Sequence, residues 1–291
     1  MQNEEASGTA LLISTSLVLL HRDPKYSYLV SKTSADVSDH VLETCAGAMR
    51  LFLPLVRQPW FRLIARFIER VTVPGILLHY ALRKKCIGAL ARSALVNGAT
   101  QVVVIGAGFD PLSFELQSEF PGVKFWEIDH PATQRHKVSA LSKLGANRLH
   151  FVAADLNATG LDKETLIKSS FDPTQRTLWI AEGLLMYLRE EMVSSLMKGV
   201  SSLSTPGSQF AFTFMERLSD GRIGFHWQRK RVNRWLRRRG EPFLWASTRT
   251  ALADVVRPWR AIRFFDDLRA MEPQLAGEPV AKGEVICLAE I

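Results

Sequence analysis

Cysteine is scarce in this sequence. Cys45, Cys86 and Cys287 are the three cysteines in 291 residues, and they are widely separated. Such a scattered, odd-numbered set gives neither the close pairs of a zinc site nor the framework of a disulfide-rich domain, so we expect no metal site. We expect these side chains to be buried as small hydrophobic groups, in a protein of the reducing cytoplasm.

Long hydrophobic runs are missing as well. The most apolar stretch near the start, residues 9–20, contains Ser14, Thr15 and Ser16 and is too short to cross a bilayer. The residues before it are acidic rather than basic, which does not resemble a secretory signal. We expect this stretch to form a buried N-terminal helix. Internal repeats and low-complexity segments are also absent from the sequence.

Acidic residues are fewer than basic ones, 29 against 37, and the formal net charge is +8. Much of the excess lies in residues 229–239, which contain Trp235 and closely follow Trp227. One interpretation is a solvated helix with its tryptophans packed inward. The other is a surface for an anionic substrate, a membrane or nucleic acid. No recognisable nucleic-acid module supports a nucleic-acid partner, so we do not expect one, and peripheral membrane contact stays open.

A change in periodicity near residue 100 divides the chain into two parts. Before it, apolar residues recur at helical spacing and predict helices at 9–20, 41–53, 60–71 and 76–95, with breaks at Pro54, Pro59 and Pro74. After it, we expect strands separated mostly by helices, at 101–105, 123–128, 148–153, 177–181, 208–214, 260–265 and 284–290. This predicts a helical cover over residues 1–97 and an α/β core over 98–291, with a basic, aromatic-rich insertion at about 216–250.

The connection between the last two expected strands bears on the sheet topology. Residues 266–282 contain Pro273, Gly277 and Pro279 and only scattered apolar residues, so a long crossover helix is not expected. The last strand should therefore run antiparallel to its neighbours. We predict a Rossmann-like, doubly wound sheet of seven strands with the last one antiparallel. This is the class I methyltransferase variant of the architecture, whereas a dehydrogenase usually ends in a parallel crossover.

The turn after the first expected strand is the most informative segment. Residues 102–105 are apolar and β-branched, Gly106-Ala107-Gly108 ends the run, and Asp110 and Pro111 open a helix. Glycine permits a sharp turn and close approach of a ligand. Asp110 suits the N-cap and Pro111 the first helical turn. A buried strand that leads into a glycine turn and a helix is typical of binding sites for nucleotide-like ligands.

The nature of the ligand follows from two further positions. Asp129 ends the second expected strand, about twenty residues after the turn, where a carboxylate can accept hydrogen bonds from both ribose hydroxyls. A dinucleotide fingerprint would also place a third glycine opposite the pyrophosphate, but the chain has Asp110-Pro111-Leu112 there. An acidic cap repels phosphate. A phosphate-free ligand such as S-adenosylmethionine therefore fits better than NAD(P).

The order of several short motifs resembles one family over nearly the whole chain. It resembles the leucine carboxyl methyltransferase-like family of S-adenosylmethionine-dependent O-methyltransferases, especially its bacterial branch. The motifs are Ser7-Gly8-Thr9-Ala10, Arg83-Lys84-Lys85, residues 101–110, Glu127-Ile128-Asp129-His130-Pro131, Ala154-Asp155-Leu156 and residues 181–188. Each motif alone is weak to moderate, and their order and spacing together are specific.

The resemblance implies a set of residues around S-adenosylmethionine. Arg83 would pair with the carboxylate of the methionine portion, because an arginine fork matches a carboxylate. Gly106 and Gly108 would line that portion, and Asp129 would bind the ribose hydroxyls. An alternative for Asp129 is to cap the helix that Pro131 opens.

The resemblance also implies contacts at the other strand ends. Asp155 and Leu156 would meet the adenine, although Asp155 could instead cap a turn with Asn157. Glu182, directly after a buried strand, would lie near the methionine amino group. Glu182 and Tyr187 are our candidate catalytic residues; Tyr187 either packs in the core or faces the acceptor.

The implied reaction is transfer of a methyl group to a carboxylate or hydroxyl of a small or partly hydrophobic acceptor. A carboxylate needs no base, which suits a sequence without a persuasive catalytic triad, metal cluster or carboxylate pair. The family's Asp-Thr-Arg is here Asp110-Pro111-Leu112, which puts a protein-carboxyl substrate in doubt. We expect aromatic residues and arginines of the 216–250 insertion to form an apolar acceptor pocket with a basic rim. The alternatives are an NAD(P)-dependent oxidoreductase and a non-enzymatic basic module.

Overall fold

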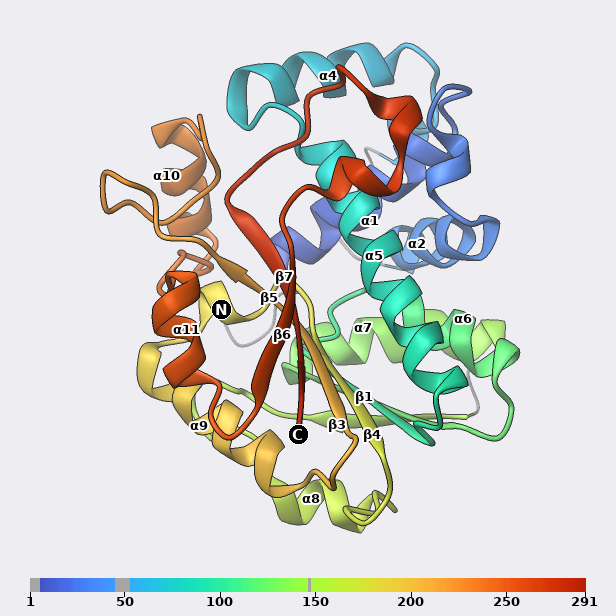
Figure 1. Ribbon diagram of the computed structural model, residues 1–291. Coiled ribbons are helices and arrows are strands. Elements are labelled where there is room, and N and C mark those ends of the chain that lie inside the picture. The colour runs from blue at the N-terminus through green and yellow to red at the C-terminus, as the bar shows by residue number, and fades with distance from the viewer. Residues whose placement is uncertain (1–5, 45–52, 146–147) are drawn as a thin grey trace.

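A single mixed sheet forms the centre of the computed structural model, which describes residues 6–44, 53–145 and 148–291 (Figure 1). Its seven strands lie in the order β3-β2-β1-β4-β5-β7-β6. They are β1 (Gln101–Ile105), β2 (Lys124–Asp129), β3 (Leu149–Ala153), β4 (Thr177–Ala181), β5 (Gln209–Met215), β6 (Arg260–Phe265) and β7 (Glu284–Glu290). The seven strands predicted from periodicity are confirmed, within one residue at each end.

The direction of the last strand is also as predicted. β7 lies between β5 and β6 and runs antiparallel to both, while β1 to β5 are parallel to one another. The order of strands reverses between β1 and β4, because the chain proceeds from β1 outward to β3 before it crosses back to β4. In an open α/β sheet, such a switch point leaves a crevice at the carboxyl ends of the strands.

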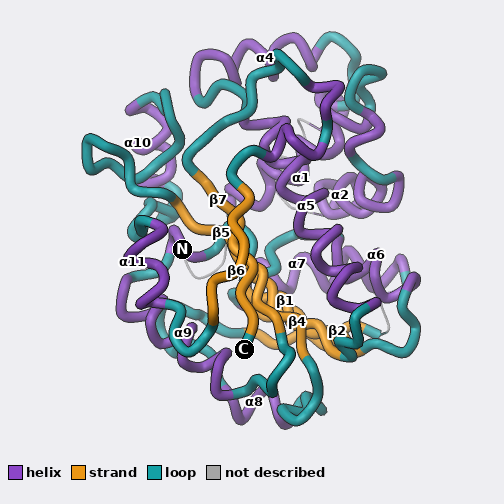
Figure 2. Tube along the Cα trace, viewed as in Figure 1, coloured by secondary structure: helices purple, strands orange, loops and turns teal. Residues whose placement is uncertain are grey.

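Helices cover both faces of the sheet (Figures 1 and 2). One face packs against α5 (Ile76–Val96), α6 (Leu112–Glu119) and α7 (Pro131–Leu141), and the other against α8 (Lys163–Lys168), α9 (Glu190–Ser202) and α11 (Arg249–Val255). The strands separate two hydrophobic clusters because alternate side chains point to opposite faces: Val102 and Val104 of β1 belong to one cluster, and Val103 and Ile105 to the other. Short 3-10 helices lie in the connections: η1 (Ser27–Leu29), η2 (Ser142–Leu144), η3 (Leu185–Tyr187), η4 (Leu268–Met271) and η5 (Pro273–Leu275).

The N-terminal helices pack onto this core. α1 (Gly8–His21), α4 (Phe61–Thr72) and α5 form where helices were predicted, and Leu17 to Leu20 of α1 are buried as expected. The helix predicted at 41–53 is wrong in its start: α2 runs Lys32–Thr44, and residues 45–52 lie outside the described part of the chain. The start of α2 was not predicted because its first turn is polar, and its buried residues begin only at Ala35 and Val37. The division at residue 97 stays a prediction.

The insertion predicted at about 216–250 contains α10 (Lys230–Arg238) and ends at the start of α11. The interpretation that its tryptophans pack inward around the basic run is wrong. Trp227 is 72% exposed and Trp235 is 37% exposed, and Leu236 is the buried residue of α10. Among the other sequence expectations, Cys86 and Cys287 are buried as predicted, while Cys45 lies outside the described residues. None of the helices in the described ranges is long and apolar enough to cross a membrane.

Candidate functional site

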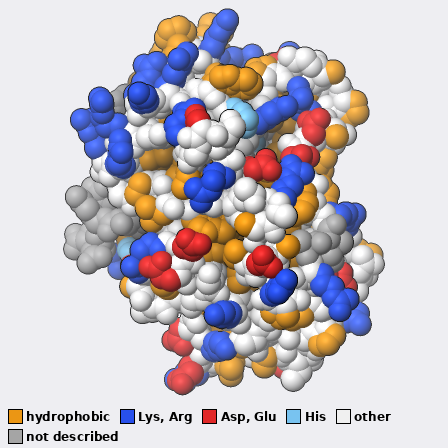
Figure 3. Space-filling view, turned by 60° about the vertical axis from the view of Figure 1, so that its left-hand side comes forward, with side chains coloured by type: hydrophobic (Ala, Val, Ile, Leu, Met, Phe, Trp, Pro, Cys, Tyr) orange, Lys and Arg blue, Asp and Glu red, His pale blue; other side chains and the backbone are white. Residues whose placement is uncertain are grey.

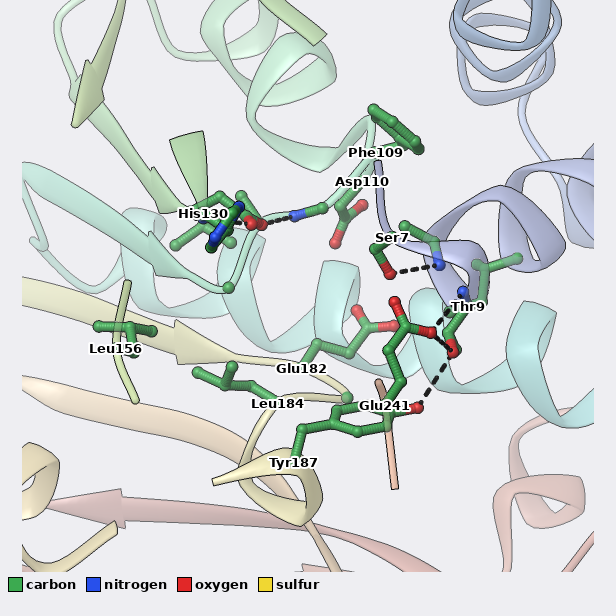
Figure 4. A pocket seen from close by; sticks show the side chains of 18 of the residues that line it. Ser7, Thr9, Phe109, Asp110, His130, Leu156, Glu182, Leu184, Tyr187 and Glu241 are labelled. Atoms are coloured by element: carbon green, nitrogen blue, oxygen red, sulfur yellow. Dashed lines mark hydrogen bonds between the residues drawn. The ribbon is translucent and has the colours of Figure 1, made fainter. Parts of the chain in front are cut away.

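A cavity of about 240 Å³ opens at the switch point, where the carboxyl ends of β1, β2, β3 and β4 meet (Figure 4). Its floor is made by the turns that follow these strands, and α1 and residues 240–241 lie over it. Every site residue predicted from the sequence lines this one cavity: Arg83, Gly106, Gly108, Asp129, Asp155, Leu156, Glu182 and Tyr187. The structure thus brings the candidate residues together from five separate segments, while their individual roles remain predictions.

The turn after β1 requires glycine. Gly106 has φ +68° and Gly108 has φ +49°, which is left-handed backbone that side-chain-bearing residues rarely adopt. A Cβ on Gly106 would stand 2.7 Å from Cδ1 of Leu184, closer than real Cβ contacts come. The backbone of the turn therefore passes directly beside the β4 loop and lines the cavity without a side chain between.

Asp129 stabilises this turn through hydrogen bonds to two backbone amides. One carboxylate oxygen accepts a hydrogen bond from the amide of Gly108, and the other accepts from the amide of His130 at 2.5 Å. Burial raises the pKa of Asp129, and the two amides oppose that shift. A carboxylate oxygen can accept more than one hydrogen bond, so both oxygens keep the capacity to accept from a ligand. Asp129 therefore combines an observed structural role with the predicted contact to ribose.

The neighbouring polar residues open the two helices at the site. His130, rather than the alternative candidate Asp129, is the N-cap of α7, and its Nδ1 accepts from the amide of Ala132 at 3.3 Å. Asp110 accepts from the amide of Leu112, the first residue of α6, at 3.0 Å, but the N-cap of α6 is Pro111, one residue later than predicted. Burial acts to raise the pKa of Asp110, but the charges of Lys84 and Lys137 lower it overall.

A buried ion network forms part of the cavity wall. Arg83 donates from Nε to Glu182 at 2.8 Å and from a terminal nitrogen to Glu284 at 2.7 Å. His79 contacts the same Glu284 oxygen at 2.8 Å, and Lys84 donates to Glu182 at 3.1 Å. Although burial disfavours the charged form, Arg83 and His79 lower the pKa of Glu284 to about 2. Arg83 thus already has two carboxylate partners within the protein.

Two carboxylate oxygens of this network, Oε2 of Glu182 and Oε1 of Glu284, are buried without a hydrogen-bond partner among the described residues. Of these two residues, Glu182 lines the cavity, and its Oε1 is held by Arg83 and Lys84. A buried, unpartnered carboxylate oxygen is energetically unfavourable and calls for a donor. Because Glu182 lines the cavity, a cationic or N–H-bearing ligand there would supply that donor.

The charge of the cavity lining is predominantly negative. Five carboxylates line it, against the two permanent cations Arg83 and Lys84; the five are Asp110, Asp129, Asp155, Glu182 and Glu241. In a partly enclosed site this balance attracts a cation and repels a pyrophosphate. The lining therefore favours a positively charged, phosphate-free ligand.

The end of the cavity below β3 is less polar. Leu156 is 7% exposed and packs in the cluster on the α8–α9 face. Asp155 accepts from the amide of Asn157 at 3.0 Å, so it does cap a turn, and its side chain is 47% exposed. This turn offers an apolar wall beside a carboxylate, which are the two features predicted for contact with adenine.

The cover of the cavity includes two residues for which the sequence predicted no role. Glu241 accepts hydrogen bonds from the amides of Gly8 and Thr9, each at 3.0 Å, and from the Thr9 hydroxyl at 2.6 Å. The free amides of the first turn of α1 are thereby satisfied by a carboxylate from the insertion. Figure 4 shows Glu241 and Thr9 beside Tyr187, whose hydroxyl lies 3.5 Å from Thr9 Oγ1. The Ser7 side chain accepts from Ala10, a local N-cap signal that was readable in the sequence.

Tyr187 both packs and faces the cavity. Its ring lies 5.4 Å from that of Phe243, and its hydroxyl points towards Thr9. Burial raises the pKa of Tyr187 far above its ordinary value, which favours the protonated hydroxyl that donates to Thr9 Oγ1.

The expected acceptor pocket of insertion aromatics and arginines is not part of this cavity, and it stays a prediction. From the insertion, the cavity lining includes Gly240 and Glu241 and none of its aromatic residues. Phe225 and Trp245 are buried, while Trp227 points to the outer surface of the molecule. The insertion's contribution to the cavity is a backbone and a carboxylate, not a basic rim.

Known proteins resemble this chain in sequence and in fold. Residues 13–201 match the family model described as leucine carboxyl methyltransferase. A Mycolicibacterium smegmatis protein, provisionally named an S-adenosyl-L-methionine-dependent methyltransferase, is 34% identical over 164 residues, which are 55% of this chain and 52% of that protein. A Mycobacterium tuberculosis H37Ra protein with the same provisional name is 40% identical over 123 residues, 41% of this chain and 38% of that one. The matched regions thus span about half or less of these relatives.

A solved structure supports the fold. A protein of Thermobifida fusca YX, provisionally described as a methyltransferase, superposes with a TM-score of 0.57 at 13% identity and covers 99% of this chain and 96% of its own. At this identity the likeness shows the shared fold alone.

Proposed function

Because the chain belongs to the leucine carboxyl methyltransferase family, we propose that it is an S-adenosyl-L-methionine-dependent methyltransferase that acts on an oxygen of a small, partly hydrophobic acceptor. The observation that carries the proposal is the acidic cavity at the switch point, with the unpartnered Oε2 of Glu182 in its wall. S-adenosylmethionine supplies an electrophilic methyl group on a positively charged sulfur, beside an ammonium and an adenosyl group without phosphate.

The residues present fit this compound. Glu182 Oε2 would accept from the ammonium, and the surrounding carboxylates would favour the positive charge. Asp129 would bind the ribose hydroxyls. Asp155 and Leu156 would contact the adenine, and Gly106 and Gly108 would let the backbone approach the methionine portion.

If Arg83 pairs with the ligand carboxylate as predicted, that carboxylate would be the third partner of its guanidinium. Nε and one terminal nitrogen already serve Glu182 and Glu284, so the other terminal nitrogen would make that contact. Gly183 supports this, because its missing side chain leaves space beside Arg83: a Cβ there would lie 3.3 Å from the second terminal nitrogen. Arg83 also holds Glu182 in place, which is a role independent of the ligand.

A carboxylate acceptor is favoured because it needs no general base, although the acidic lining does not complement its charge. Methyl transfer requires alignment of the attacking oxygen and exclusion of water, and a carboxylate is already ionised at neutral pH. Tyr187 stays protonated and would orient the acceptor as a hydrogen-bond donor. Glu182 would act through its contact with the methyl donor, and His130 is engaged as a helix cap. A hydroxyl acceptor would need a base that neither Tyr187 nor His130 provides in this arrangement.

Calorimetry with the demethylated product, S-adenosylhomocysteine, and with NAD⁺ tests the ligand. We expect binding of S-adenosylhomocysteine and none of NAD⁺. Glu182→Gln should weaken this binding about tenfold or more, because an amide replaces a charge-assisted partner. Glu272→Gln is the matched control, since Glu272 is also buried but pairs with Lys85 outside the cavity. Tight NAD⁺ binding with no heat from S-adenosylhomocysteine would refute the proposal in favour of an oxidoreductase.

The acceptor class has its own test. The protein is incubated with methyl-labelled S-adenosylmethionine and a panel of hydrophobic carboxylic acids, phenols and amines. We expect label in products that release methanol in mild alkali, as methyl esters do. Alkali-stable products from phenols or amines would contradict a carboxylate acceptor without contradicting methyl transfer.

A further inference from the structure

Helix α4 presents an apolar stripe to solvent. Five of its large side chains or those just before it are exposed: Trp60 at 49%, Leu63 at 72%, Ile64 at 43%, Phe67 at 66% and Ile68 at 51%. Their spacing places them on one side of the helix. The adjoining edge, with Phe61 and Ala65, packs against the cluster that contains Val18 and Leu42. The helix is therefore attached to the protein by one edge, while no part of the chain that the structure describes covers the neighbouring stripe.

The described part of the chain places a strongly basic helix next to this stripe. α10 and the residues at its two ends expose seven cations: Arg229, Lys230, Arg231, Arg234, Arg237, Arg238 and Arg239. The amide of Arg229 donates to the carbonyl of Thr72 at 3.1 Å, and the Arg231 guanidinium donates to that of Val71 at 2.7 Å. These bonds tie the start of α10 to the end of α4. Arg66 and Arg70 add exposed cations on α4 itself.

The two helices form one continuous surface, which we call the α4–α10 face. It comprises the apolar stripe of α4, the exposed Trp227 and the seven cations. Figure 1 shows α4 and α10 at the same end of the molecule, and Figure 3 shows Lys and Arg side chains gathered beside hydrophobic ones over the upper part of the surface. Large exposed apolar groups together with clustered cations are rare on a monomer surface without a partner.

We propose that the α4–α10 face binds the surface of an anionic phospholipid bilayer. A helix that carries Trp, Phe and Leu on one side and arginines along its border lies in the plane of a membrane interface, with the apolar side chains among the acyl chains. The cations of α10 and α4 then meet anionic headgroups. Trp60 and Trp227 suit the headgroup level, where tryptophan is enriched.

The charge distribution favours a bilayer over two other occupants. A second copy of the chain, packed through the same face about a two-fold axis, would bring two sets of like charges together. Nucleic acid would satisfy the cations, but aliphatic side chains such as Leu63, Ile64 and Ile68 have no role against phosphates and would remain exposed. An anionic bilayer satisfies the cations and buries the stripe at once.

This face is joined to the cover of the cavity. Gly240 and Glu241, which line the cavity, directly follow the basic run of α10. Docking of the α4–α10 face would therefore place the cavity cover beside the bilayer. The proposal itself does not depend on methyltransferase activity.

Co-sedimentation with vesicles tests the proposal on the whole chain. Vesicles that mix phosphatidylglycerol with phosphatidylcholine are compared with vesicles of phosphatidylcholine alone, at low and high salt. We expect binding to the anionic vesicles that weakens as salt rises. Leu63→Glu with Phe67→Glu should lower the partition coefficient about tenfold or more, because two inserted side chains become anionic. Arg234→Gln with Arg237→Gln and Arg238→Gln should have a similar effect.

Matched controls separate this face from general effects of charge. Val96→Glu with Ile167→Glu also places two glutamates at exposed apolar positions, 77% and 48% exposed, on α5 and α8 away from α4. Lys163→Gln with Lys168→Gln and Lys198→Gln removes three exposed cations elsewhere. Both controls should bind the vesicles with only a small loss, and circular dichroism confirms that each variant is folded.

The remaining outcomes overturn the proposal. Equal binding to both vesicle types, no binding to either, or loss of binding in the controls as large as in the test variants would each contradict it. Light scattering provides a further check: a dimer that Leu63→Glu with Phe67→Glu dissociates would assign the face to a second copy. Salt-sensitive binding to duplex DNA but not to vesicles would assign it to nucleic acid.

Discussion

Glu241 and Thr9, 232 residues apart in the sequence, are joined by a hydrogen bond of 2.6 Å above the cavity. The same carboxylate accepts from the first two amides of α1, so an acidic residue from the insertion stabilises the start of the N-terminal helix. The cover of the cavity thus consists of two segments that hold each other in place. If one segment moves, the other loses its hydrogen-bond partner. Access to the cavity therefore depends on the contact between Glu241 and the start of α1.

Glu241→Gln should loosen this cover. The neutral amide is a weaker acceptor, and we expect a loss of about 1 kcal/mol in unfolding free energy together with weaker binding of S-adenosylhomocysteine. Denaturant unfolding and calorimetry measure the two effects. Asp162→Ala is the control, because Asp162 caps α8 with two hydrogen bonds but does not line the cavity. It should lower stability comparably and leave binding unchanged; equal loss of binding in both variants would contradict a specific role for Glu241.

Gly106→Ala should abolish ligand binding. The new Cβ would meet Leu184 at 2.7 Å, and φ +68° is unfavourable for alanine, so we expect a destabilisation of about 1–3 kcal/mol and a displaced turn. Gly122→Ala is the control, since nothing lies within 4 Å of its Cβ. Adding Leu184→Ala to Gly106→Ala removes the clash but not the backbone strain, so thermal unfolding of the double variant should show partial rescue. Full binding by Gly106→Ala alone would show that the turn does not approach the ligand.

Glu284 should make the free energy of unfolding depend on pH in the acidic range. Its pKa in the folded protein, about 2, lies below the ordinary value of 4.5, so its contribution is present above pH 4.5 and is lost as the pH falls towards 2. The shift corresponds to about 3 kcal/mol. Glu284→Gln should be less stable at neutral pH and lose less stability on acidification over this window. Glu290→Gln, at the other end of β7, is the control; parallel acid profiles for wild type and Glu284→Gln would argue against the network.

The Tyr187→Phe variant should show whether the Tyr187 hydroxyl acts as a hydrogen-bond donor or as a general base. Because the hydroxyl stays protonated, its removal should reduce kcat only about tenfold or less and leave the pH profile unchanged. A general base would instead give a loss of about a hundredfold or more. Single-turnover assays across pH make the distinction. A large loss accompanied by a change in the pH profile would assign Tyr187 to proton abstraction and favour a hydroxyl acceptor.

The sequence allowed the sheet and most of the cavity lining to be predicted because their signals are local. Strand β1 is a run of buried β-branched residues, and the glycine turn and Asp129 follow at fixed offsets. Since the carboxyl ends of parallel strands meet at one edge, locating the strands also located Asp129, Asp155 and Glu182 near one another. The antiparallel β7 followed from the composition of the segment before it.

The parts that were missed depend on contacts between distant segments. His79 and Glu284 are 205 residues apart, and neither carries a local sign that they share a hydrogen bond. A weak hint was the spacing of His79 and Arg83, which puts both on one side of α5. Glu241 gave no sign that it would reach α1. One of the two interpretations of the basic run packed its tryptophans inward, but only the packing of α10 decides which side it buries.

The position of β7 has a consequence for the order in which the sheet forms. β7 is inserted between β5 and β6, yet β6 precedes it in the chain. During synthesis β6 emerges before β7, the strand with which it pairs, so β6 can join the sheet only after β7 has been made. Glu284, at the start of β7, is likewise synthesised after the other members of the buried charge network.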